Sequence, residues 1–466
     1  MQYLSTRDSK KNFFVFSNVL LEGLAEDGGL FCPEIYPSVT LDRLQDFKRY
    51  SYVELANAIF TDFIGEDIPE SDLGDLLKKT YTKEAFGTEA IAPVEYLKDG
   101  IYLQDLSSGP SLAFKDMAMQ FLGNIMEYEL GRRSERLTIL GASSGDTVSA
   151  AEEAFRGKEA VNIFMLTPKE GMSSFQKAQA GSILDTNIFN ISIDGPFDVC
   201  QDLVKEINAD LEFKKDVSLG AVNSINWGRI LAQVVYYFKG YLSVVDSVGD
   251  AMDVVVPSGN FGNVLAGYVA KSMGLPLRKL IVATNENVVL DHFFKTGIYE
   301  QRDVVVTSSP SMDISKASNI ERLFFDICGR DAKSLRQIMA TFEKTKSIDL
   351  SGYLYEIQNQ LGFSSGRSSH EQRIEAIKEI YKDCKRIIDP HTAAAVHIAL
   401  DQQEKAFPVL CMETAKPAKF EDTIKEALGF IPPRPQAFIG LEEKKQRFYD
   451  VEANASSIKE FIKSHI

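Results

Sequence analysis

The sequence MDVVVPSGNFGNVLAGYVAKSMG, residues 252–274, predicts a buried strand that runs through a glycine-rich turn into a helix. The valines at positions 254–256 favour a strand, and Gly259 and Gly262 let the backbone turn sharply. Backbone N–H groups can then converge on an anion at the start of the helix. The turn has neither the Lys-Ser/Thr of a Walker loop nor the spacing of a dinucleotide-binding GxGxxG. It therefore predicts either a phosphate site or an ordinary strand-to-helix turn.

Short apolar runs alternate with helical patterns along most of the chain. Because strands that alternate with helices form parallel sheets covered by helices, this pattern predicts an α/β fold. Besides residues 254–257, we expect buried strands at residues 101–106, 137–141, 161–166, 188–193, 280–283 and 409–412, and helices at residues 114–129, 196–208, 228–245 and 262–273. The predicted organisation is an accessory helical region (1–95), a catalytic core in two subdomains (96–290 and 383–430), a mostly helical insertion (291–382) and a tail (431–466).

The composition excludes several classes of partner and site. The 466 residues carry a formal net charge of -15, so an anionic membrane or a nucleic acid would repel the protein. The cysteines form no CxxC pair and the histidines no HExxH motif, so neither a disulfide framework nor a metal site is predicted. Residues 1–11 are too polar for a signal peptide, and no apolar run reaches the length of a membrane span. We therefore expect a cytoplasmic protein that acts on a small molecule.

Three further segments place polar residues at or just before the start of a helical pattern. GASSGDT (141–147) offers hydroxyl and amide groups for a carboxylate, although such residues are more often helix caps. Lys115 lies at a helix start, where the macrodipole disfavours a cation. That local misfit indicates function, but a single lysine is usually a surface charge. NSINWGR (223–229) offers an arginine fork for an oxyanion, or a capped helix with a solvated arginine.

Taken together and in this order, these segments resemble the motifs of the threonine synthase family. GPSLAFKD (109–116) resembles the family's GPTxAFKD around its Schiff-base lysine, and SSGDT (143–147) resembles its TSGDT. VPSGNFGN (256–263) resembles its phosphate loop, and NSIN followed by Arg229 resembles its NSIN-x-x-R. EGLAEDGGLFCP (22–33), SMDIS (311–315), PHTAA (390–394) and ETAKPAKF (413–420) are similar to further blocks of the family. The N-terminal region and the insertion resemble those of the longer microbial and fungal branch.

The resemblance implies a fold-type II enzyme with two parallel-rich sheets and the cofactor pyridoxal 5'-phosphate. Its reaction would be the β,γ-replacement that converts O-phospho-L-homoserine and water to L-threonine and phosphate, the last step of threonine biosynthesis. Lys115 would be the catalytic lysine that carries the cofactor, and Thr414 would face the pyridine nitrogen. The cofactor phosphate would be held by Ser258, Gly259, Asn260, Phe261, Gly262 and Asn263. The substrate carboxylate would face Ser143, Ser144, Gly145, Asp146 and Thr147, and the substrate phosphate would face Asn223, Ser224, Asn226 and Arg229.

Some assignments stay open at this point. Shorter relatives have asparagine at the position of Asp146, where it contacts the 3′-oxygen of the cofactor, and an ionised aspartate cannot donate that bond. A lyase that converts phosphohomoserine to 2-oxobutyrate would share every motif, whereas a serine/threonine dehydratase needs no second phosphate site. A non-catalytic scaffold would be expected to lack Lys115 or the Arg229 cluster, and both are present. The resemblance to the longer branch also implies a monomer.

Overall fold

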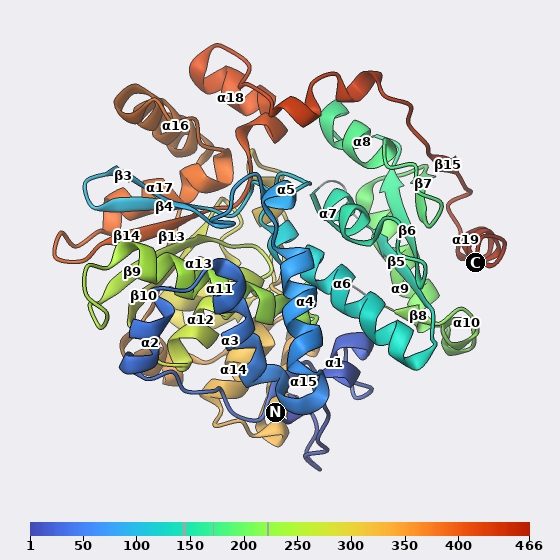
Figure 1. The fold of residues 1–466 in the computed structure, drawn as a ribbon, viewed down its shortest axis with the longest axis horizontal. Coiled ribbons are helices and arrows are strands. Elements are labelled where there is room, and N and C mark those ends of the chain that lie inside the picture. Colours follow the sequence, from blue (N-terminus) through green and yellow to red (C-terminus); the bar gives the residue numbers. More distant parts are fainter. Residues whose placement is uncertain (143–145, 171, 221–222) are drawn as a thin grey trace.

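The computed structural model describes residues 1–142, 146–170, 172–220 and 223–466. These residues contain a six-stranded sheet and a five-stranded sheet, which lie on the left and right of Figure 1 with helix α6 (Lys115–Arg133) between them. The strand orders are β13–β10–β9–β14–β4–β3 and β15–β7–β6–β5–β8. The predicted α/β fold with two parallel-rich sheets is therefore confirmed.

The six-stranded sheet is parallel except at one edge, where β3 runs antiparallel to β4. Because five strands share one direction, their carboxyl ends meet at a single edge, which we call the carboxyl edge. Ligands of open α/β sheets bind outside this edge. Its strands are β13 (Phe363–Arg367), β10 (Leu277–Thr284), β9 (Met252–Pro257), β14 (Val409–Glu413), β4 (Ile101–Asp105) and β3 (Val94–Lys98).

Helices cover both faces of the six-stranded sheet, because its central strands are apolar on both sides. One face packs on α16 (His370–Cys384), α17 (Pro390–Gln402) and α18 (Glu421–Leu428). The other face packs on α11 (Trp227–Val244) and α12 (Gly262–Ser272), which belong to the largest hydrophobic core. The two layers of helices cover the faces of the sheet, and loops lie at its carboxyl edge.

The five-stranded sheet is parallel throughout. Its strands are β15 (Tyr449–Asp450), β7 (Ile188–Ile193), β6 (Val161–Pro168), β5 (Leu137–Ala142) and β8 (Leu219–Gly220). One face packs on α9 (Phe197–Ala209) and α19 (Ala455–Lys463), and the neighbouring helices are α7 (Asp146–Phe155), α8 (Ser174–Gly181) and α10 (Leu211–Asp216). Figure 1 shows how the tail after α18 crosses from the larger sheet to reach β15 and α19 beside the smaller one.

The remaining elements surround the larger sheet. The N-terminal region contains β1 (Tyr3–Ser5) antiparallel to β2 (Phe31–Pro33), and helices α1 (Phe16–Glu22), α2 (Leu41–Phe47), α3 (Tyr52–Ile64), α4 (Glu70–Thr80) and α5 (Lys83–Phe86). The range expected to be an insertion contains α13 (Val289–Thr296), α14 (Ile320–Ile327), α15 (Ala332–Thr345), and β11 (Ile298–Glu300) antiparallel to β12 (Ser347–Asp349). It also contains β13, the edge strand of the larger sheet, so this range is joined to the core by strand pairing.

The seven predicted strands are all present, as β4, β5, β6, β7, β9, β10 and β14. Apart from β13, the strands that the sequence did not reveal are short or largely exposed. β8 and β15 have only two residues each, which is too short for a periodic pattern. Among the described residues, no helix combines the length and apolarity that a membrane crossing requires.

Candidate active site

The backbone before α6 is held by the chain that leaves β14. The amide of Phe114 donates to the carbonyl oxygen of Thr414 at 2.9 Å, and the amide of Lys416 donates to the carbonyl oxygen of Leu112 at 3.1 Å. This pairing fixes Lys115, the first residue of α6, beside the carboxyl edge of the larger sheet. Thr414 is buried at the same place. The structure therefore brings together the two residues expected at opposite ends of the cofactor ring.

The side chain of Lys115 reaches the first helix of the smaller sheet. Its Nζ donates to Oγ1 of Thr147 at 3.0 Å, and both side chains are half-buried. Desolvation lowers the pKa of Lys115 to about 8, while Asp146 opposes the shift and the cations Arg229 and Lys419 add to it. An appreciable share of the amine is then neutral close to pH 7, so it can act as a nucleophile or a base.

The glycine-rich turn at residues 258–263 has groups that suit an anion. Phe261, the N-cap of α12, lies in the left-handed region at φ 66°, and no side chain caps the helix. The first amides of α12 are therefore available to a phosphate. Within the described chain, the buried Oγ of Ser258 and the buried Nδ2 of Asn263 have no hydrogen-bond partner. Buried polar groups are normally paired, so these atoms indicate a ligand.

Two neighbours fix the shape of this turn. The hydroxyl groups of Tyr236 and Tyr237 donate to Oδ1 of Asn263 at 2.7 and 2.8 Å, which sets the orientation of its amide. A Cβ atom at Gly259 would lie 2.4 Å from the carbonyl oxygen of Ser311, so only glycine fits without a shift. The SMDIS segment therefore packs directly on the glycine-rich turn.

Asp146, whose role was open from the sequence, forms a buried ion pair. Its Oδ1 lies 2.9 Å from Nζ of Lys419, in the turn that follows β14. Burial alone would raise the pKa of Asp146, but Lys419 and Lys115 hold it well below its usual range. Its side chain is thus an ionised carboxylate directed at a lysine. An ionised carboxylate would repel the carboxylate of a substrate, so this geometry favours Lys419 as the partner of Asp146, and its contact with the substrate carboxylate stays a prediction.

Ser311 connects Asp146 to a histidine of the larger sheet. Its Oγ donates to Oδ2 of Asp146 at 3.2 Å, and its amide donates to Nε2 of His391 at 3.1 Å. Because Nε2 accepts this bond, Nδ1 of His391 carries the proton and donates to Asp389 at 2.8 Å. The PHTAA and SMDIS segments therefore meet at the start of α7.

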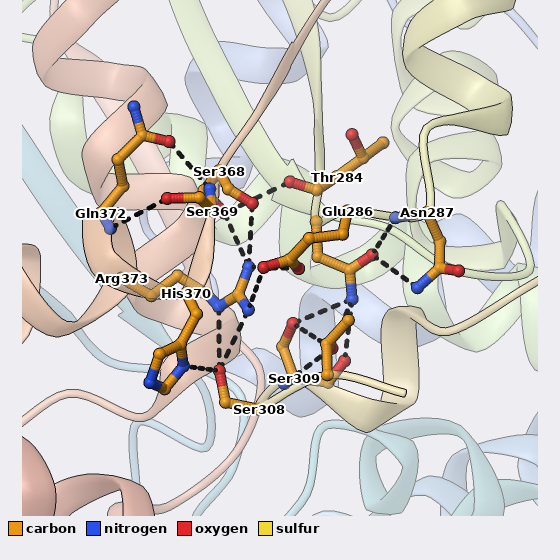
Figure 2. Close-up of polar contacts among 12 residues, drawn as sticks. Thr284, Glu286, Asn287, Ser308, Ser309, Ser368, Ser369, His370, Gln372 and Arg373 are labelled. Atoms are coloured by element: carbon orange, nitrogen blue, oxygen red, sulfur yellow. Dashed lines mark hydrogen bonds and ion pairs between the residues drawn. The ribbon is translucent and has the colours of Figure 1, made fainter. Parts of the chain in front are cut away.

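The turn that carries Ser311 is anchored on the ends of β10 and β13 (Figure 2). The guanidinium of the buried Arg373 donates to the carbonyl oxygen of Ser368 at 2.9 Å and to Oγ of Ser308 at 3.0 Å. It also forms an ion pair with Glu286 at 3.0 Å. These contacts hold the turn against the larger sheet, so that Ser311 meets the smaller one at a fixed position.

The NSINWGR segment brings an arginine to the site. Arg229 is buried in the first turn of α11, and its charge acts on Lys115. Asn226 supports the segment, because its Oδ1 accepts the Gly228 amide at 2.9 Å and its Nδ2 donates to the carbonyl oxygen of Leu20 at 2.8 Å. Of the other two predicted members, Ser224 is half-buried and Asn223 is exposed. Arg229 therefore supplies the positive charge, and Asn226 acts as a helix cap.

A residue pair that the sequence did not reveal joins the two segments that are predicted to bind phosphate groups. Nδ2 of Asn319 donates to the carbonyl oxygens of Ser224 at 3.1 Å and Asn260 at 3.2 Å. The buried Arg322 donates in turn to Oδ1 of Asn319 at 2.6 Å and to the carbonyl oxygen of Ile225 at 2.7 Å. This bridge keeps residues 223–229 next to the glycine-rich turn.

Some predicted site residues lie outside the part of the chain that the structure describes. Conversely, the structure brings to the site two residues that were not predicted. Ser143, Ser144 and Gly145 lie outside the described residues. Lys419 and His391 lie in ETAKPAKF and PHTAA, but the sequence assigned a role only to Thr414 in these motifs. For Lys419, its position soon after the buried strand β14 was the available signal, because parallel strands end at the ligand-binding edge.

Comparisons with known proteins show which family the chain is similar to. A family model described as "Threonine synthase N terminus" matches residues 2–81, and one described as "Threonine synthase, C-terminal" matches residues 392–462. The threonine synthase of Methylobacillus glycogenes is 50% identical over 478 residues, which cover 100% of each chain.

Solved structures extend the similarity to three dimensions. The crystal structure of PLP-bound threonine synthase from Brucella melitensis superposes with a TM-score of 0.96 at 40% identity, covering 100% of this chain and 99% of that one. Threonine synthase from yeast superposes with a TM-score of 0.94 at 37% identity, covering 100% and 98%. With full-length identity of this degree and the same fold, the chain belongs to the threonine synthase family.

Proposed function

We propose that this protein is a pyridoxal-phosphate-dependent threonine synthase that converts O-phospho-L-homoserine and water to L-threonine and phosphate. The observation that best supports the proposal is the position of Lys115. Its amine lies at the carboxyl edge, has a pKa of about 8, and shares its surroundings with the buried Arg229. One amine for proton transfer and one cation for a phosphate are the two groups that this reaction requires.

The residues present fit the cofactor. Lys115 would hold it covalently, the amides of residues 258–263 would hold its phosphate, and Thr414 would face its ring nitrogen. The free Oγ of Ser258 and the uncapped start of α12 support this placement of the phosphate. When bound, pyridoxal phosphate supplies an electron sink that makes protons next to the amino-bearing carbon removable.

Lys115 would then move the protons. With its amine free, it would take a proton from Cα and then one from Cβ as the phosphate leaves Cγ, and it would return protons to Cγ and Cα after water adds at Cβ. A pKa of about 8 suits both roles, because a base works best when its pKa is close to the operating pH. The hydroxyl of Thr147, 3.0 Å away, orients the amine.

Arg229 would bind the phosphate that leaves the substrate, assisted by Asn223 and Ser224. The planar guanidinium matches two phosphate oxygens. It supplies a local positive charge in a protein whose net charge is -15.

We also propose that the protein acts as a monomer in the cytoplasm. The resemblance to the longer branch supports a monomer, and the five cysteines are free thiols, as expected in a reducing compartment.

A larger side chain at position 259 should weaken cofactor binding. A Gly259→Val side chain would collide with the backbone of Ser311 and push apart the turn that presents the amides. We expect the cofactor content after gel filtration, measured by absorbance, to fall at least about tenfold, since several hydrogen bonds of roughly 1 kcal/mol each are lost. Gly352→Val is the control, because its Cβ meets nothing within 4 Å. Full retention by a folded Gly259→Val variant would rule out this cradle.

A carboxylate at position 414 should change the chemistry without removing the cofactor. Thr414 offers a neutral hydroxyl, which leaves the ring nitrogen largely unprotonated. Thr414→Asp should favour the protonated ring, shift the visible spectrum and increase transamination products, whereas Thr414→Ser should behave like the wild type. If the spectrum and products of Thr414→Asp match the wild type, the ring nitrogen lies elsewhere.

Product analysis tests the proposed reaction. The purified protein with pyridoxal phosphate is incubated with O-phospho-L-homoserine, and amino acids, phosphate and oxo acids are quantified. We expect threonine and phosphate in equal amounts, and no turnover of homoserine, which lacks the phosphate. Release of phosphate with 2-oxobutyrate would instead identify a lyase, and absence of both products would reject the substrate.

A further inference from the structure

The mechanism above uses one lysine of the site, but a second lysine is buried close to it. Lys419 makes three contacts through Nζ, with Asp146 at 2.9 Å, Gln179 Oε1 at 3.2 Å and the Ser111 carbonyl oxygen at 2.7 Å. Three acceptors match the three N–H groups of an ammonium ion. The charge of Lys419 is therefore fully hydrogen-bonded inside the protein.

We propose, on the basis of the function proposed above, that Lys419 and Asp146 are a pair of positioning residues that sets the charge state of the Lys115 amine. Asp146 begins α7 directly before Thr147, whose hydroxyl accepts a hydrogen bond from Lys115. Lys419 pairs with the carboxylate of Asp146 from the turn that follows β14. The pair thus places one negative and one positive charge beside the reactive amine.

The two members of the pair act on Lys115 with opposite signs. A negative charge nearby favours the ammonium form, and a positive charge favours the neutral amine. The charged groups that face Lys115 are Asp116 on α6, Asp146 on α7, Arg229 on α11 and Lys419 after β14. Without Lys419, Lys115 would be the main remaining cation that acts on the carboxylate of Asp146, and this carboxylate would favour its ammonium form. Lys419 neutralises Asp146 and so leaves the amine free to react.

A purely structural role predicts something different. In a structural role, the ion pair would only hold α7 against the larger sheet. Removal of either residue would then lower the free energy of unfolding and the activity together. It would not move the pH at which Lys115 becomes reactive. The direction of the pH shift in each variant therefore separates the two roles.

The experiment measures how fast the full-length, cofactor-stripped protein captures added pyridoxal phosphate at different pH values. Capture requires the neutral amine, because Nζ forms a bond to the aldehyde carbon and the aldehyde oxygen leaves as water. The visible absorbance of the product gives the rate. The variants are Lys419→Met, Asp146→Asn and the double variant, and their thermal unfolding confirms that they fold.

We expect the midpoint of the rate profile to rise by about one pH unit or more in Lys419→Met, and to fall by a similar amount in Asp146→Asn. Below the midpoint, one unit corresponds to about a tenfold change in rate. The double variant should return toward the wild-type midpoint. The exposed Lys425→Met and Asp422→Asn on α18 are matched controls that should leave the profile unchanged.

Midpoints that stay unchanged, or that move in the same direction in both single variants, would overturn the proposal. The ion pair would then have only a structural role. If Lys419→Met does not fold, Asp146→Asn decides alone, because only a fall in its midpoint agrees with the proposal. Failure of the wild type to capture the cofactor would instead reject the proposed function, so the two failures are distinguishable.

Discussion

A Lys115→Ala variant should lose threonine formation almost completely. The amine both holds the cofactor and moves protons, and removal of a positioned acid–base group alone lowers a rate by about 10²–10⁴-fold. We therefore expect a decrease of at least about 10³-fold in kcat at saturating cofactor. The visible absorbance of the covalently held cofactor should disappear as well.

The structure provides a control for this variant. Lys425→Ala removes an exposed lysine of α18 and should leave both activity and spectrum unchanged. The Lys115→Ala substitution should leave the fold intact. Among the contacts of the described residues, it removes one side-chain hydrogen bond, from Lys115 to Thr147. Substantial turnover by this variant would show that another residue moves the protons.

The second large effect is expected at Arg229. Arg229→Ala should weaken binding of O-phospho-L-homoserine by about 1.5–3 kcal/mol, the value of a hydrogen bond to a charged group. This corresponds to roughly a ten- to hundredfold loss in affinity. The kcat should fall too, because the charge that develops on the departing phosphate loses its partner. Cofactor absorbance should persist, since the cofactor phosphate has its own turn.

Steady-state kinetics beside an absorbance spectrum check this prediction. Arg229→Lys should fall between the wild type and Arg229→Ala, because an ammonium ion offers one point charge in place of a planar fork. The exposed Arg49→Ala is the matched control. If KM and kcat of Arg229→Ala stay near the wild type, the phosphate of the substrate binds elsewhere, and the segment from Ser311 to Arg322 is the next candidate.

The parts of this site that the sequence predicts are the ones encoded locally. The run of valines before Ser258 and the glycines after it predict a strand and an open turn, because both depend on neighbouring residues alone. Lys115 is detectable because a cation at a helix start contradicts the local dipole. The seven central strands follow from short apolar runs in the same way.

The parts that the sequence could not predict depend on distant contacts. The ion pair of Asp146 with Lys419 arises only when α7 and the turn after β14 meet across the two sheets. For Asn226 the sequence offered a helix cap as one alternative, but the bond from its amide to Leu20 in the N-terminal region depends on a distant contact. β13 was assigned to an insertion because its own residues after Phe363 are Ser, Ser, Gly and Arg, and its place at the sheet edge is set by pairing with β10.

The central claim is that Lys115 carries the cofactor, and borohydride labelling tests it most directly. The protein with bound pyridoxal phosphate is reduced with borohydride, digested, and its peptides are analysed by mass spectrometry. Reduction makes the bond between the cofactor and its lysine permanent. We predict that the added mass is found on Lys115 and is absent from the Lys115→Ala variant. Labelling of Lys419, or of any other lysine in place of Lys115, would contradict the account.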